Sequence, residues 1–105
     1  MNTQTTATAY QVNTIDINAL EWFDKANGNS YFAGYITLNF GQPDEEMIKM
    51  PFQYGYGDFY IFEALETLRK LGYITETHTA ELRQHGIILR SLIQRGCKKR
   101  DLMQY

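Results

Sequence analysis

The chain has 105 residues, of which 44% are hydrophobic and 14% are aromatic. This length allows one domain of ordinary size, and this composition excludes a disordered chain because it can supply a packed core. A formal net charge of −2 argues against both a strongly basic DNA-coating protein and a strongly acidic mimic of nucleic acid.

The N-terminal segment, residues 1–13, is rich in Thr, Ala and Gln and has no hydrophobic periodicity. We interpret it as a flexible arm, partly ordered by Tyr10 and Val12, and we expect residues 14–105 to form a single α+β domain. The segment lacks the charged start and apolar core of a signal peptide. Cys97 is the single cysteine, which excludes an internal disulfide and favours a reducing compartment. We therefore expect a cytoplasmic protein, in the host cytoplasm if a phage encodes it, and no contact with a membrane.

The first half of the domain has the alternation that is typical of strands. Ile15 and Ile17 alternate with polar residues and begin a strand that runs toward Phe23. Asn27-Gly28 predicts a type I′ hairpin turn, which needs positive φ at both central residues. The next run predicts a second strand, and its more apolar face should turn toward the core: Phe32, Gly34, Ile36, Leu38 and Phe40.

A third strand follows the turn Gly41 to Asp44 and covers residues 47–54. Pro51 has no N–H to donate to a ladder, so this strand should lie at an edge of the sheet or be bulged there. Asp58 then has the chemistry of a helix N-cap, with a carboxylate that can accept a backbone N–H. We expect a helix from Asp58 to Leu71, closed by Gly72 in the left-handed conformation.

The last third of the chain is harder to assign. Thr77 or Thr79 begins a shorter helix that ends near His85, with Gly86 as its stop. Residues 87–95 favour a fourth strand because they are rich in Ile and Leu and lie between two glycines. They also fit a continuation of the helix, because Leu82, Gly86, Leu89 and Ile93 keep helical spacing.

These elements predict an antiparallel sheet of three or four strands packed against one main helix and a shorter second helix. The residues expected to form much of the core are Phe32, Ile36, Leu38, Phe52, Phe62, Leu65 and Leu68.

Sequence motifs for catalysis or cofactor binding are weak. His78, His85 and Cys97 match no zinc spacing. Gly55 and Gly57 do not continue into a dinucleotide fingerprint, because Tyr60 stands where the next glycine would be. The acidic run Asp44 to Glu46 is typical of a solvated turn. We expect no enzyme activity, no catalytic residue, no metal and no cofactor.

Three segments together resemble a group of small uncharacterised proteins of phages, prophages and other mobile elements. These segments are WFDKANGNSYF, FQYGYGDFY leading into a helix, and KKRDL near the end of the chain. The resemblance covers most of the stretch from Ile15 to Leu102. It implies a setting in a mobile element and no particular mechanism.

The chain contains eight Tyr and six Phe. This aromatic content favours a function in which the protein binds another macromolecule. We expect a phage-type accessory protein that binds and occludes a host protein or nucleoprotein complex. An inhibitor of a host defence complex, of the anti-CRISPR or antirestriction type, would act in this way without catalytic residues. The expected contact residues, on two glycine-containing turns that would meet at one rim of the sheet, are Asn29, Tyr31, Tyr54, Tyr56 and Tyr60.

The alternative is a module that binds single-stranded nucleic acid. Aromatic rings on a sheet can stack on bases while nearby cations neutralise phosphates. Tyr31 and Tyr35 share one strand face. The cations expected to contact nucleic acid belong to the C-terminal segment: Arg95, Lys98, Lys99 and Arg100. A solvated basic tail is the competing interpretation of this segment.

Overall fold

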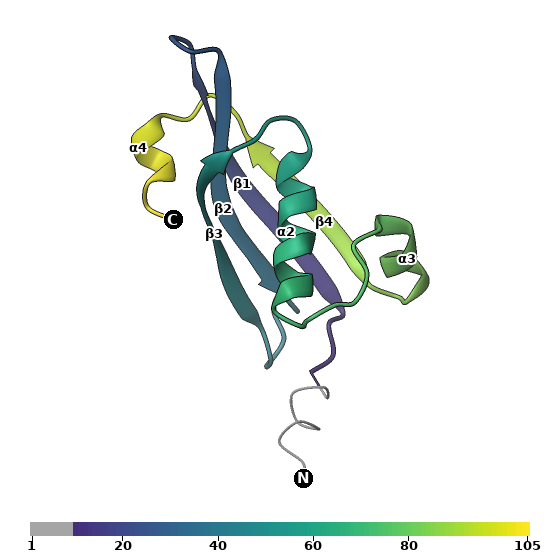
Figure 1. Cartoon of the computed structure of the whole chain (residues 1–105). Coiled ribbons are helices and arrows are strands. Elements are labelled where there is room, and N and C mark those ends of the chain that lie inside the picture. The colour runs from purple at the N-terminus through teal and green to yellow at the C-terminus, as the bar shows by residue number, and fades with distance from the viewer. Residues whose placement is uncertain (1–9) are drawn as a thin grey trace.

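A computed structural model describes residues 10–105, and residues 1–9 of the predicted arm lie outside the described residues. The described part is one α+β domain with a four-stranded sheet. Within residues 10–105, four strands and three helices follow one another: β1 Thr14–Asp24, β2 Asn29–Leu38, β3 Glu46–Tyr54, α2 Phe59–Lys70, α3 Thr79–Gln84, β4 Ile88–Gln94 and α4 Lys99–Leu102 (Figure 1). None of these helices is both long and apolar enough to cross a membrane.

The sheet is mixed, which corrects the expectation of an antiparallel sheet. Its strand order is β3-β2-β1-β4, and β4 pairs with β1 in parallel. The cause is the connection between the two edges, because the chain leaves β3 and passes through α2 across one face before it reaches β4 (Figure 1). A hairpin would have reversed the chain, whereas a helical crossover returns it in the same direction. Residues 87–95 are therefore mainly strand, as favoured.

The core lies between the sheet and α2. Ile15, Ile17, Ile36 and Leu38 are each at most 1% exposed, and they share the sheet face that receives the helix. On α2 the buried residues are Tyr60, Ala64, Leu65 and Leu68, whose spacing places them on one side of the helix. Phe32, Ile36, Leu38, Leu65 and Leu68 are confirmed as core residues.

Two of the expected core residues lie elsewhere. Phe62 is 53% exposed, because it lies at the margin of the buried side of α2, near Leu65 but turned away from Ala64 and Leu68. Phe52 is half-buried and stacks on Tyr31, on the sheet face that α2 does not cover. An irregularity in the β2–β3 register near Pro51 places Phe52 there. Pro51 thus lies in a bulged edge strand, as predicted. Phe40, expected on the core face, is 66% exposed beyond the end of β2.

The hairpin between β1 and β2 lies where Asn27-Gly28 predicts it, although its turn type differs. Gly28 has a φ of 72°, and its N–H donates to the carbonyl of Asp24 at 2.7 Å. Asn27 does not have positive φ, and the loop spans residues 25–28, so it is not a two-residue type I′ turn. The Asp24 carboxylate accepts hydrogen bonds from Asn27 Nδ2 at 2.8 Å and from the N–H of Ala26 at 3.1 Å. These bonds hold the pKa of Asp24 below its usual value.

Helix α2 ends as predicted and begins differently. Gly72 has a φ of 88°, and the N–H of Tyr73 donates to the carbonyl of Leu68 at 2.9 Å. This is the hydrogen bond of a Schellman ending. Asp58 stands at the N-cap position, but its side chain makes no capping hydrogen bond. Helix α3 ends one residue before His85, consistent with the expected shorter helix.

Asn39 ties the start of β1 to the turn between β2 and β3. It is fully buried and has a φ of 53°, the single positive value at a non-glycine residue among residues 10–105. Its Oδ1 accepts from the N–H groups of Asn13 at 2.7 Å and Thr14 at 3.2 Å. Its Nδ2 donates to the carbonyl of Gln11 at 2.8 Å and to Asp44 Oδ2 at 3.1 Å. Residues 10–13 are therefore held against the domain, and Val12 is 5% exposed.

The C-terminal segment covers part of the second sheet face instead of forming a solvated tail. Leu102 of α4 is fully buried, and the ring of Tyr105 stacks on Tyr35 with centroids 6.2 Å apart. The N–H of Lys98 donates to Asp101 Oδ2 at 2.9 Å, which fixes the first turn of α4. Helices α2 and α4 thus lie on opposite faces of the sheet.

Candidate functional site

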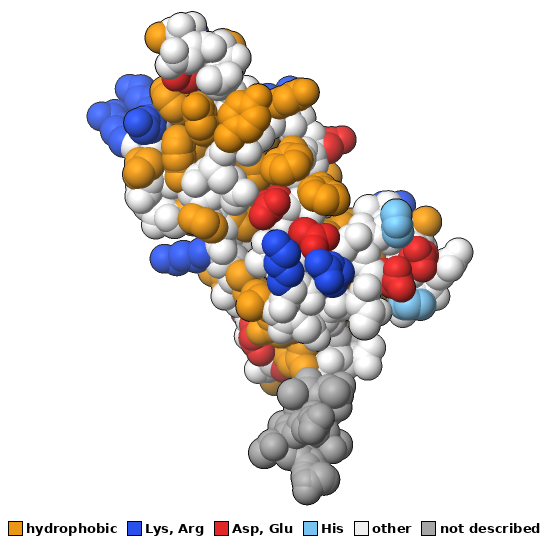
Figure 2. Space-filling model, viewed as in Figure 1, with side chains coloured by type: hydrophobic (Ala, Val, Ile, Leu, Met, Phe, Trp, Pro, Cys, Tyr) orange, Lys and Arg blue, Asp and Glu red, His pale blue; other side chains and the backbone are white. Residues whose placement is uncertain are grey.

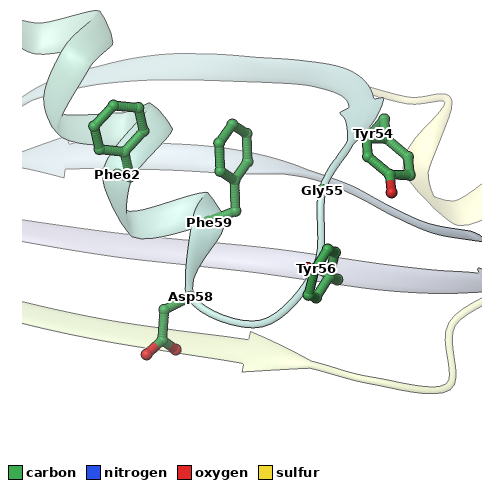
Figure 3. A pocket seen from close by; sticks show the side chains of 6 residues that line it. All are labelled: Tyr54, Gly55, Tyr56, Asp58, Phe59 and Phe62. Atoms are coloured by element: carbon green, nitrogen blue, oxygen red, sulfur yellow. The ribbon is translucent and has the colours of Figure 1, made fainter.

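Exposed apolar side chains gather on the face shown in Figure 2, and one such feature lies where β3 passes into α2. Four aromatic side chains form it, with exposed fractions of 56% for Tyr54, 69% for Tyr56, 41% for Phe59 and 53% for Phe62. We call these four residues the aromatic patch. Together with Gly55 and Asp58 they line a pocket of about 550 Å³ (Figure 3).

The segment between β3 and α2 needs glycine for its shape. A Cβ at Gly55 would come within 2.6 Å of Phe59 Cδ2 and 2.7 Å of Phe32 Cε1. Without a side chain at Gly55, Phe59 can pack edge-on against the buried ring of Phe32, with centroids 6.2 Å apart. Gly57 has a φ of 61°, which lets the chain turn directly into the helix. The Tyr-Gly-Tyr-Gly-Asp sequence thus positions the aromatic patch.

The patch is anchored on its inner side and open on its outer side. Phe59 touches Phe32 below it and Phe62 beside it, the latter with ring centroids 5.7 Å apart. In Figure 3 these two phenyl rings stand next to each other above the first turn of α2, and both tyrosines lie across the pocket from Phe62. The Asp58 carboxylate points away from the phenyl rings. The arrangement offers apolar area with one acidic group at its margin.

The structure brings the two expected turns together. The N–H of Gly55 donates to the carbonyl of Ser30 at 3.0 Å, and Tyr31 is paired with Tyr54 across β2 and β3. The Tyr31 and Tyr54 rings meet edge to face at 5.8 Å. The hairpin and the break after β3 therefore share one rim of the sheet, as the sequence predicts.

The five expected contact residues do not share one environment. Tyr54 and Tyr56 are exposed, whereas Asn29 and Tyr31 are half-buried. Tyr60 is 5% exposed and belongs to the core under α2, so the expectation that it forms part of an open contact surface is wrong. Tyr60 lies on the same side of the helix as Ala64 and Leu68, which explains its burial.

Sequence reasoning missed Phe59 and Phe62 as surface residues. Residues three, four and seven apart share one face of a helix. Phe59 and Phe62 therefore lie on the same face of α2 as Glu63 and Glu66. A phenylalanine pair in line with two glutamates indicates the solvent side of a helix, and this signal is present in the sequence.

The residues of the nucleic-acid alternative are partly occupied by contacts within the chain. The Tyr31 ring stacks on Trp22 at 5.4 Å and on Phe52 at 5.0 Å. The Lys99 ammonium lies 5.7 Å from the centroid of the Trp22 ring, a cation–π geometry. Arg95 lies 3.7 Å from Glu21, while Lys98 and Arg100 are exposed.

Within residues 10–105, no group of three or more His, Cys, Asp or Glu side chains is arranged to hold a metal ion. Comparisons of the chain with protein families, with curated proteins and with solved structures found no match. The resemblance to mobile-element proteins stays a prediction.

Proposed function

We propose that this protein acts by binding another protein through the aromatic patch, as an accessory factor that occludes a site on its target. The observation that carries the proposal is the exposure of four aromatic rings around one pocket. Tyr and Phe are enriched in protein interfaces, where rigid rings supply large contact area at low conformational cost.

The chemistry of the patch supports a protein target. A buried interface core depends on apolar anchors that fill pockets, and polar groups at the margin set the orientation. Here the pocket offers space for an apolar side chain of the target, and Asp58 offers a carboxylate at the margin. The further proposal that the target is a host defence complex, as for an anti-CRISPR or antirestriction protein, rests on the resemblance of three sequence segments.

Binding of single-stranded nucleic acid has less support. Base stacking on Tyr31 or Tyr35 would have to compete with Phe52, Trp22 and Tyr105, which already contact these two rings. Lys98 and Arg100 are exposed and could contact phosphates. Among residues 10–105, however, neither lies over an aromatic ring of the sheet face that α2 does not cover.

The test compares the wild type with Tyr56→Ala, Phe62→Ala and the matched control Phe40→Ala. Phe40 is 66% exposed and lies beyond the end of β2 that is distant from the hairpin, so its truncation removes a similar exposed ring away from the patch. Each variant is used to capture proteins from nuclease-treated host lysate, and the captured protein is then purified and titrated. We expect loss of binding for the two patch variants, an unchanged affinity for Phe40→Ala, and unchanged melting temperatures.

Salt dependence separates the two functions. Binding through the patch should change little between 50 and 200 mM salt, whereas contacts with about 6–10 phosphates would weaken binding by roughly 10³–10⁵ over that range. Capture that needs intact nucleic acid, or that survives both patch substitutions, would contradict the proposal.

A further inference from the structure

The two edges of the sheet are protected unequally. The β3 edge contains Pro51 at a bulge and carries Lys49, devices that prevent a further strand from pairing there. The β4 edge has the sequence ILRSLIQ, with neither proline nor glycine nor lysine. Its single charged residue, Arg90, is bound to Asp16 of β1, with Nε 2.6 Å from Oδ1. On β4, Ile88 is 54% exposed and Leu92 is 66% exposed.

The backbone of β4 directs half of its polar groups away from the sheet. The N–H of Ile88 donates to the carbonyl of Asn13 at 3.0 Å, so the polar groups of Ile88 point toward β1. Because these directions alternate along a strand, the N–H and C=O groups of Leu89, Ser91 and Ile93 point away from β1. Among residues 10–105 the sheet ends at β4, and no further strand receives these groups.

We propose that β4 pairs with β4 of a second copy of this chain, antiparallel and about a twofold axis at Ser91. In this register Leu89 lies opposite Ile93 of the second copy, and Ser91 lies opposite its own counterpart. All three outward-facing residues then exchange hydrogen bonds with an identical strand. The apolar pairs lie on the face that already packs against the core, since Leu89 and Ile93 contact it.

The side-chain pattern favours a second copy and this register. Leu89 and Ile93 are equally distant from Ser91, so the pattern of that face is the same in both directions, as a twofold interface requires. A shift of one pair would place Leu89 opposite Arg95. On the other face, Leu92 would lie against the aliphatic stem of Arg90, whose guanidinium is held by Asp16.

The test uses Ser91→Pro, with Ser91→Thr as its matched control. Proline at position 91 removes an N–H that points away from β1, so the β1–β4 ladder keeps its hydrogen bonds. Sedimentation from low to high micromolar concentration should show the wild type and Ser91→Thr rising above the mass of one chain, 12.2 kDa. Ser91→Pro should associate at least about tenfold more weakly, because a hydrogen-bonded pair is lost at the axis. Leu92→Lys serves as a second disrupting variant if Ser91→Pro does not fold.

Amide exchange of the wild type gives an independent readout. The amides of Leu89, Ser91 and Ile93 should exchange more slowly as the concentration rises, while those of Ile88, Arg90 and Leu92 stay protected throughout. A mass of one chain at every concentration, or association that both disrupting variants leave unchanged, would overturn the proposal. Equal exchange of the Leu89, Ser91 and Ile93 amides at low and high concentration would do the same.

Discussion

Replacement of Asn39 separates two contributions to stability at the end of the sheet distant from the aromatic patch. Asn39→Gly keeps the left-handed backbone and removes the side chain. Four hydrogen bonds of 2.7 to 3.2 Å are lost, to Asn13, Thr14, Gln11 and Asp44. At ~1 kcal/mol net for each bond, the free energy of unfolding should fall by about 4 kcal/mol. Asn39→Ala should lose a further ~1 kcal/mol or more, because an L-residue with a Cβ is strained at a φ of 53°.

The assay is urea unfolding of both variants, followed by amide exchange. A domain of this size has a free energy of unfolding of roughly 5–15 kcal/mol, and most of this range exceeds the loss expected for either variant. Both variants should therefore still fold at low temperature. The amides of Asn13 and Thr14 should lose protection in both variants, because their acceptor is the Asn39 side chain. Equal stabilities for Asn39→Gly and Asn39→Ala would refute the backbone argument. A loss below ~1 kcal/mol in Asn39→Gly would refute the role of the side chain.

Asn39→Asp tests the hydrogen bonds that the Nδ2 group of Asn39 donates to Gln11 and Asp44. It keeps an oxygen for Asn13 and Thr14 but places a second carboxyl group next to Asp44, at the position of Nδ2. Burial and the neighbouring charge should raise the pKa of the introduced carboxyl group. The variant should therefore be least destabilised below pH ~4, where the group is neutral in both states, and more destabilised as the pH rises. A loss that does not depend on pH would contradict this reasoning.

Three further predictions address the core, the hairpin and one tyrosine. Leu65→Ala should lower the free energy of unfolding by roughly 2–5 kcal/mol, since Leu65 is 1% exposed, whereas Phe62→Ala should change it little. Gly28→Val should destabilise the fold because valine tolerates a φ of 72° badly, while Gly28→Asn should be milder; equal melting temperatures would contradict this. The hydrogen bond of the Tyr73 hydroxyl to Glu46, with burial, raises the pKa of Tyr73 from 10.0 to about 12. The stability that Tyr73 contributes should thus be complete below pH ~10 and decline as the pH rises toward 12, a decline that Tyr73→Phe should lack in alkaline unfolding.

Local patterns predicted most elements of the fold. Alternation predicted β1 and β2, and the stop signals at Gly72 and Gly86 predicted the ends of α2 and α3. Pro51 predicted the bulged edge strand. The direction of β4 could not be predicted, because its pairing with β1 depends on contacts between distant residues such as Ile15 and Leu89.

The errors in the predicted core arose from residues whose environment depends on tertiary contacts. Phe62 was assigned to the core by its size and its spacing to Leu65, but the buried side of α2 instead includes the small Ala64. Phe52 changed face because of one irregularity in the register. Asn39 gave no signal as a central hydrogen-bonding residue, because all of its partners come from other parts of the chain or from a turn.

The candidate site was predicted in position but not in composition. The sequence placed Tyr54 and Tyr56 on a turn beside the hairpin, and the pairing of Tyr31 with Tyr54 agrees with that. Tyr60 was included because it follows these residues closely, yet the helix turns it inward. The helical spacing along α2 predicts that Phe59 and Phe62, and not Tyr60, belong to the exposed site.

The two ends of the sheet differ in how they use their aromatic residues. At the Asn39 end, Tyr10 and Tyr73 meet edge to face at 5.5 Å, and both hydroxyl groups are hydrogen-bonded, to the carbonyl of Asp44 and to Glu46. Both rings are thus used in contacts within the domain. At the other end, Tyr56 and Phe62 are more than half exposed, so they contribute little of the area buried on folding. Truncation of Tyr56 or Phe62 should therefore leave stability nearly unchanged, and a loss of binding in these variants can be assigned to the surface itself.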